Sequence, residues 1–337
     1  MNKFLKRLIP ITLTILMCFT VSSTYAKNEI VIKMGSIAPD GSPWDVAIKK
    51  LSAEWSQITN GEVTIKVYPG GIAGDEADMV RKMRIGQLQG AVLTSVGLSN
   101  ISPEISLFYL PMYFKNDAEL DYILEKNSAK FNAILEKKGF VTISWTKSGW
   151  VNFFSKDPAF VPDDIKKIPL AVSANDSDVL QAWRKSGFNA IPLSSNDLLA
   201  SLQSGMVKAF YAPPLAAAAF QWFALAPNMC SIKIAPLVGG VVVSSKTWKQ
   251  IPAKYHKPMM ESAVKLSSEL FGESNQLENK AIETMKKHGL KINEVPADKM
   301  DDWYKYSAQG HEGMIGKKIP KALYNDITKQ LNEFRKK

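Results

Sequence analysis

The residues that most often carry catalysis or bind metals are few and widely spaced in this chain. His256, His288 and His311 are its only histidines, and of these only His311 has an acidic neighbour, Glu312. One adjacent pair does not supply the ligands of a metal site. Cys230 has no clear histidine partner in the sequence and is typical of a small buried hydrophobe. Because the GxGxxG, P-loop and HExxH motifs are absent as well, the sequence predicts no enzyme, no cofactor and no metal.

Large aromatic side chains are a stronger signal, because they gather at or after the ends of predicted strands. A set of this kind can line an apolar binding cleft, although any single member is as typical of an ordinary core. Glu76, Asn152 and Ser173 would add the few polar contacts that orient a ligand. The aromatic residues are Trp145, Trp150, Phe153, Phe154, Phe210, Tyr211, Phe220, Trp222 and Phe223.

Two runs of alternating strand and helix signals position these residues. In the first run, Ser42 and Pro43 begin a helix whose apolar residues recur at helical spacing, and residues 63–67 alternate apolar and polar side chains. The alternation restarts near residue 168, so we predict an α/β fold with two similar domains. The predicted strands are 30–36, 63–67, 91–94, 140–144, 168–172, 190–193, 207–211 and 241–244, and the predicted helices are 42–58, 75–87, 116–138, 175–186, 195–205, 252–288 and most of 303–337.

The first 26 residues have the pattern of a secretory signal peptide. Three basic residues precede an apolar run at residues 8–21, and small residues lead to Ala26. The run is shorter than the ~20 residues that span a bilayer, which disfavours a membrane anchor. Met17 disfavours lipidation of Cys18, which is the other alternative. We therefore expect cleavage after Ala26 and export.

The charge of the chain excludes one class of partner. The formal net charge is +10, and removal of the three cations of the leader lowers it to +7. Lysines alternate with acidic residues, and no basic stripe with interleaved aromatic residues is present, so we expect no nucleic-acid partner. The exported part keeps one cysteine and therefore has no internal disulfide.

Five stretches, in this order along the chain, carry a resemblance to a known family. They are MGSIAPDGSPWD, TNGEVTIKVYPGGIAGDEADMVRKMRIGQLQGAV, LFYLPMYF, PDDIKKIPLAV and SGMVKAFYAPP. The second is the most distinctive, because it combines a strand, a G-x-x-G-x-E turn and a basic helix that ends in glycine. Together they resemble the extracytoplasmic solute receptors of tripartite ATP-independent periplasmic (TRAP) transporters, the DctP-like family. The resemblance covers the whole exported chain.

This resemblance implies a periplasmic binding protein-like fold: two α/β lobes with a central cleft, crossing strands and a long lobe-spanning helix. We place that helix at residues 252–288, with a kink near Gly272. The expected lobe I comprises residues 27–150 plus about 236–272, and lobe II comprises 151–235 plus about 273–337 with the C-terminal helices. The resemblance also implies that a small molecule binds in the cleft and that the closed receptor delivers it to the TRAP membrane permease.

Three positions depart from the family pattern. Alignment of PDDIKKIPLAV puts Ala171 where the family has an arginine that binds a substrate carboxylate, Val151 replaces a second arginine, and Ala212 replaces an amide. An arginine–carboxylate fork is a strong and specific contact, so its loss favours a hydrophobic or amphipathic ligand. The alternatives are an organic acid held by another cation, such as Lys147 or Arg184, and a periplasmic enzyme or lipid-handling protein on the same scaffold.

The resemblance suggests one further partner, because some family members with apolar clefts pair with a periplasmic tetratricopeptide-repeat protein. The expected ligand-binding residues are Trp44, Glu76, Trp145, Trp150, Val151, Asn152, Ala171, Ser173, Phe210, Tyr211, Ala212 and Trp222.

Overall fold

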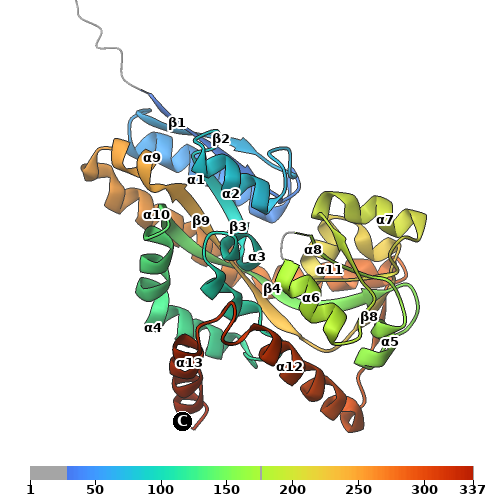
Figure 1. Cartoon of the computed structure of the whole chain (residues 1–337). Coiled ribbons are helices and arrows are strands. Elements are labelled where there is room, and N and C mark those ends of the chain that lie inside the picture. The colour runs from blue at the N-terminus through green and yellow to red at the C-terminus, as the bar shows by residue number, and fades with distance from the viewer. Residues whose placement is uncertain (1–28, 175–176, 337) are drawn as a thin grey trace, which may run out of the picture.

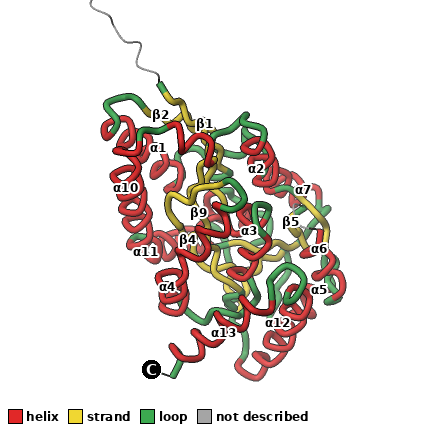
Figure 2. The backbone as a smooth tube through the Cα atoms, turned by 60° about the vertical axis from the view of Figure 1, so that its left-hand side comes forward, coloured by secondary structure: helices red, strands yellow, loops and turns green. Residues whose placement is uncertain are grey.

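The computed structural model describes residues 29–174 and 177–336, and these form two α/β lobes joined by crossing strands (Figure 1). The predicted α/β, periplasmic binding protein-like architecture is therefore confirmed. The predicted signal peptide and Cys18 lie outside the described residues. Seen from the side, the strands run through the middle of the molecule and the helices cover them (Figure 2).

Lobe I is built on a parallel sheet in which β1 pairs with β2 on one side and with β3 on the other. The hydroxyl of Ser42 accepts a hydrogen bond from the backbone N–H of Asp45 and so caps helix α1, as the sequence predicts. Trp55 of α1 is fully buried and donates to the carbonyl of Met259. The elements are β1 (Ile30–Ser36), α1 (Pro43–Ile58), β2 (Val63–Tyr68), α2 (Glu76–Arg84), β3 (Gly90–Thr94), α3 (Ser95–Ser99), η1 (Pro103–Tyr109), α4 (Asp117–Glu136) and α9 (Ser245–Gln250).

Lobe II repeats this arrangement on a smaller parallel sheet, in which β5 lies between β6 and β7. Its two short outer strands, β8 and β10, also pair in parallel. The elements are α5 (Pro162–Lys166), β5 (Leu170–Ser173), α6 (Ser177–Lys185), β6 (Ala190–Leu193), η2 (Ser195–Asp197), α7 (Leu198–Ser204), β7 (Ala209–Ala212), α8 (Pro214–Ala219), η3 (Trp222–Ala224), β8 (Asn228–Cys230), β10 (Lys291–Asn293) and η4 (Ala297–Lys299).

Two long antiparallel strands, β4 (Phe140–Ser155) and β9 (Ala235–Ser244), cross from one lobe to the other. They lie between β3 and β7 and join the sheets of the two lobes. The strand order of the resulting sheet is β2-β1-β3-β9-β4-β7-β5-β6. Their register is irregular between Thr142 and Ser144 and again between Lys147 and Trp150. The two lobes thus share the crossing strands instead of having separate sheets, and the second irregularity lies where β4 passes between them.

The predicted single helix over 252–288 is wrong in one respect: the segment forms two helices, α10 (Ala253–Gly272) and α11 (Ser274–Lys287). The break falls at Gly272, where the sequence predicts a kink, because glycine weakens a helix interior. Helix α10 packs on α1 of lobe I, and α11 packs on α8 of lobe II. The pair therefore spans both lobes. Helix α10 also contains Pro258 near its start.

The C-terminal helices divide between the lobes. Helix α12 (Met300–Met314) packs on α6, with Trp303 and Tyr306 in the core of lobe II. Helix α13 (Lys321–Phe334) packs instead on α4 of lobe I, where Ile327 and Leu331 join the core. The expected assignment of 273–337 to lobe II therefore does not describe α13. No described helix, in 29–174 or 177–336, is long and apolar enough to cross a membrane.

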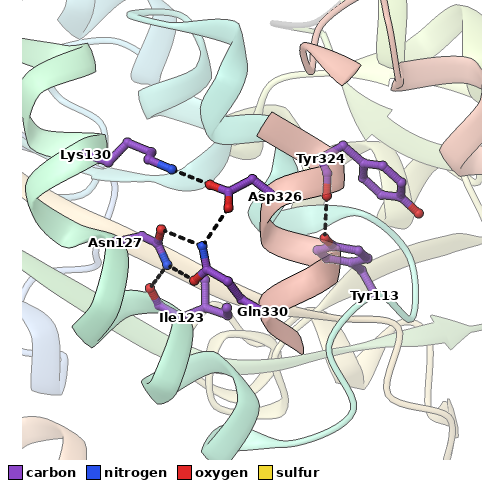
Figure 3. Close-up of polar contacts among 7 residues, drawn as sticks. All are labelled: Tyr113, Ile123, Asn127, Lys130, Tyr324, Asp326 and Gln330. Carbon is purple, nitrogen blue, oxygen red and sulfur yellow. Dashed lines mark hydrogen bonds and ion pairs between the residues drawn. The ribbon is translucent and has the colours of Figure 1, made fainter. Parts of the chain in front are cut away.

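A buried amide pair fixes α13 on α4 (Figure 3). The side-chain amide of Asn127 donates to the Oε1 atom of Gln330 at 2.8 Å and to the carbonyl of Ile123 at 3.0 Å. Gln330 donates back to Asn127 at 3.3 Å and to Asp326 at 3.1 Å. Both amides are nearly inaccessible to water, so water cannot replace a hydrogen-bond partner that either of them loses.

Gln330→Leu should therefore lower the free energy of unfolding by about 1–3 kcal/mol, because the buried Asn127 amide loses its partner. Urea denaturation followed by circular dichroism measures this. Adding Asn127→Leu should recover part of the loss, since both polar groups are then absent. A double variant that is less stable than the sum of the two single changes would contradict the pairing.

Candidate ligand-binding cleft

Three cavities meet between the lobes at Leu237 on the crossing strand β9. The central cavity, of about 180 Å³, is lined by Ile37, Glu76 and Thr94 from lobe I and by Ala171 from lobe II, among others. The aromatic pocket, of about 110 Å³, lies beside α6 and α12 and shares Val151, Ser173 and Tyr211 with the central cavity. The lobe I pocket, of about 120 Å³, lies between α1, α10 and the sheet.

Nine of the twelve expected ligand-binding residues line these cavities. Trp44 lines the lobe I pocket. The other eight line the central cavity, and among them Val151, Ala171 and Ala212 are the three departures from the family pattern. The eight are Glu76, Val151, Ala171, Ser173, Phe210, Tyr211, Ala212 and Trp222.

Trp145, Trp150 and Asn152 do not line these cavities, because each packs elsewhere. The Trp145 indole N–H donates to Asn132 at 2.8 Å, and the Trp150 indole N–H donates to Asp117 at 3.0 Å. The buried amide of Asn152 donates to the carbonyl oxygens of Cys230 and Ile232. For these three residues the expectation of a cavity-lining position is corrected. Asn152 fixes the segment after β8, and both tryptophans belong to the side of lobe I that faces α4.

Several lining residues were not predicted as ligand-binding residues. Thr94 ends strand β3, and Tyr109 ends η1, from which its ring reaches the aromatic pocket. Leu237 stands in the middle of the crossing strand β9 and touches all three cavities. The position of Thr94 could have been found from the sequence, since ligands of α/β sheets lie at the carboxyl ends of the strands. The other two positions depend on contacts between distant segments.

Glu76 is the buried carboxylate of the central cavity. It begins α2, and its carboxylate accepts hydrogen bonds from the backbone N–H and the hydroxyl of Thr94 at 2.5 and 2.8 Å. Burial raises the pKa of Glu76 to about 7, and the hydrogen bonds from Thr94 only partly oppose this. No described cation forms an ion pair with Glu76. Asp75, beside it, also lines the cavity.

Positive charge is missing from the cleft. The described residues that line the three cavities include no lysine, arginine or histidine. Lys147 forms an ion pair with Asp121, and Arg184 donates two hydrogen bonds of 3.2 Å to the carbonyl of Ala190. Neither of the two cations expected for an organic-acid receptor therefore lines these cavities. The same described residues contain no group of three metal-ligating side chains either.

The lobes come together at the mouth of the cleft. Gly71 lies before α2 in lobe I, with φ of +72°, and a Cβ atom there would lie 2.5 Å from Oδ1 of Asn196 in lobe II. This distance is shorter than any real contact of a Cβ atom. A Cβ atom at Gly71 would thus require the exposed Asn196 side chain to move where the two lobes meet.

Comparison with known proteins decides the family. The family described as bacterial extracellular solute-binding protein, family 7 (DctP), matches residues 34–318. The chain belongs to this family. Its members are described as solute-binding proteins, which agrees with the expected class of receptor.

The sequence relatives are distant. A solute-binding protein of Roseobacter denitrificans is 26% identical over 188 residues, which is 55% of this chain and 57% of that protein. The chain therefore aligns with little more than half of that relative. The 2,3-diketo-L-gulonate-binding periplasmic protein of Escherichia coli is 23% identical over 285 residues, 82% of this chain and 84% of that protein.

Solved structures share the fold over nearly the whole chain. A TRAP periplasmic solute binding protein from Ralstonia eutropha, with bound acetolactate, has a TM-score of 0.83 at 22% identity, covering 90% of this chain and 99% of that one. One from Desulfovibrio salexigens, with bound orotic acid, has a TM-score of 0.82 at 18% identity, covering 90% and 98%. One from Pseudomonas putida F1, with bound D-glucuronate, has a TM-score of 0.81 at 20% identity, covering 90% and 96%.

Gly71→Ala should weaken ligand binding by about threefold to tenfold, because Asn196 must move before the lobes can close. Gly70→Ala is the matched control. Gly70 also has a positive φ, of +62°, but a Cβ atom there would meet nothing within 4 Å. Calorimetric titration with a solute that binds the wild type measures the dissociation constants of the two variants. If both variants lose affinity equally, backbone strain and not the contact at the mouth is responsible.

Glu76 should make stability fall as pH rises from about 4.5 to 7. In this window the folded chain keeps the Glu76 proton while the unfolded chain releases it, so rising pH favours unfolding. Glu76→Gln should remove about 3 kcal/mol of this change, a size that follows from the pKa difference. Denaturant titrations of both proteins at pH 5 and 8 test this, and equal changes in the two proteins would show that Glu76 does not titrate there.

Proposed function

We propose that this chain is the periplasmic receptor of a TRAP-type secondary transporter, which binds an organic acid between its lobes and delivers it to the membrane permease. The carrying observation is the central cavity, which residues of both lobes line at the carboxyl ends of their parallel strands. This is where ligands of two-lobed α/β proteins bind. Family membership supports the same role.

The ligand class corrects the main hypothesis of the sequence analysis. The solved relatives hold acetolactate, orotic acid and D-glucuronate, which are organic acids and not hydrophobic molecules. The predicted hydrophobic ligand therefore has no support from the relatives, and the organic-acid alternative fits them better. A tetratricopeptide-repeat partner stays a prediction, which co-purification from the periplasm would test.

The lining of the cleft restricts which organic acids can bind, because the described lining residues include no arginine. Asp75 and Glu76 are the charged side chains among the described residues of the central cavity, and both are acidic. A bare anion would find no ion pair in this cavity and would have to share it with two acidic side chains. The lining is otherwise largely apolar or aromatic, as Val151, Phe210 and Trp222 illustrate. We therefore infer an organic acid with an apolar or aromatic body and little or no net negative charge.

Titration of the wild type and Ala171→Arg with organic acids tests this function. At least one organic acid should raise the melting temperature of the wild type, by an amount equivalent to about 2.7 kcal/mol at a hundredfold excess over its dissociation constant. Ala171 lies 8% exposed in the cavity wall, so an arginine there should improve the binding of orotate or D-glucuronate at least about tenfold.

Ala171→Met is the matched control, since it adds a long side chain without charge. Its affinity for the same acids should not rise. Stabilisation of the wild type by a neutral apolar probe, but by no organic acid, would contradict the proposed function. An equal gain in Ala171→Arg and Ala171→Met would contradict the role of the missing cation.

A further inference from the structure

The aromatic pocket carries more information about the ligand than the central cavity does. Five aromatic side chains line it, and they come from five different elements: Tyr109 from η1, Phe153 from β4, Trp183 from α6, Tyr211 from β7 and Tyr306 from α12. Tyr109 belongs to lobe I, whereas Trp183, Tyr211 and Tyr306 belong to lobe II. The pocket is therefore built from residues of both lobes.

The rings of the pocket hold one another in place. Trp183 stacks on Tyr211 with ring centroids 5.3 Å apart and an angle of 22° between the planes. Phe153 meets Trp183 edge-on at 6.0 Å, and Tyr306 lies 5.8 Å from Trp183. Phe153 is fully buried and Tyr306 is 5% exposed. Such mutual contacts fix the wall before a ligand arrives.

The electrostatic surroundings of this pocket favour a cation. No charged side chain is among its described lining residues. The adjoining central cavity contributes the carboxylates of Asp75 and Glu76 and no described cation. Aromatic rings attract cations through the negative charge on their faces, most strongly where water is excluded. A positive group in the aromatic pocket would thus be stabilised by the rings, with the acidic side chains of Asp75 and Glu76 in the adjoining cavity.

The pocket also selects among cations. A primary ammonium group carries three N–H donors that need acceptors. The polar side chains that line the pocket, apart from its tyrosine hydroxyls, are Ser173 and Ser186. The hydroxyl of Tyr109 is already hydrogen-bonded to Ser106 and Ser99. A fully alkylated ammonium has no N–H to satisfy and presents methyl groups to the rings, so it suits this wall better.

We propose that the organic acid is a betaine-type zwitterion, whose alkylated ammonium group occupies the aromatic pocket. The inference rests on the proposed function, because it presupposes that an organic acid binds in the cleft. It explains how this cleft can hold an acid without an arginine: the ligand brings its own positive charge and has no net charge to be repelled.

Two matched ligand pairs test the proposal on the unmodified protein. Glycine betaine and trimethylammoniobutanoate are titrated calorimetrically beside their carbon analogues, in which a tert-butyl group replaces the trimethylammonium. The analogues keep the shape and the carboxylate and lose only the positive charge. At least one betaine should bind at least about tenfold more tightly than its own analogue.

Tyr306→Leu should reduce this preference, because leucine keeps an apolar wall but removes one ring. Tyr304→Leu is the control: Tyr304 lies two residues away on α12 and is 56% exposed. Circular dichroism checks that both variants are folded. If Tyr306→Leu does not fold, the titrations of the two ligand pairs on the wild type decide the proposal.

Each outcome separates the two claims. Analogues that bind as tightly as the betaines would overturn the cationic assignment and leave the organic-acid receptor intact. The same holds if neither member of either pair binds while orotate or acetolactate does. If no carboxylate of any kind binds, the proposed function itself fails.

Discussion

The antiparallel pairing of β4 and β9 is the constraint on which the rest of the structure depends. These strands pair from Phe140↔Ser244 to Val151↔Ala235, and β4 then continues into lobe II to pair with β7. Both lobes therefore grow outward from one ladder. Leu237 and Val151, which lie on it, form the floor where the cavities meet. The position of the cleft is thus a consequence of the crossing, and the helices α10 and α11 follow the same crossing on the outside.

The chemistry of the cleft is determined by the absence of a cation among its described lining residues. Alanine stands at 171 and 212 and valine at 151, so the cleft retains the buried carboxylate of Glu76 without a described cation to pair with it. Burial then raises the pKa of Glu76, which reports how poorly the site tolerates a negative charge. We propose that an acid in such a site carries its own compensating positive charge, for which the five aromatic rings beside the cavity supply a place.

Local patterns in the sequence predict the elements well, and they place Val151, Ala171 and Ala212 on cavity walls through the resemblance of short motifs. They fail for Trp145, Trp150 and Asn152 because the predicted strand ends at residue 144, whereas β4 continues to Ser155. These three residues therefore lie within the strand, where their side chains contact α4 or the segment after β8. They also miss Tyr109 and Leu237, whose roles arise from contacts between segments distant in the chain. The sequence predicts a kink near Gly272, where the helix breaks. By contrast, the packing of α13 on lobe I includes the buried Asn127–Gln330 pair, which no local pattern reveals.

The most direct measurement is mass spectrometry of the solute that co-purifies with the protein after export to the periplasm, first as an intact complex and then after release by denaturation. We expect one molecule per chain that contains a carboxylate and a compensating positive charge, and that the protein rebinds after its removal. A co-purifying neutral lipid, or another molecule without a carboxylate, would show that the cleft does not bind an organic acid.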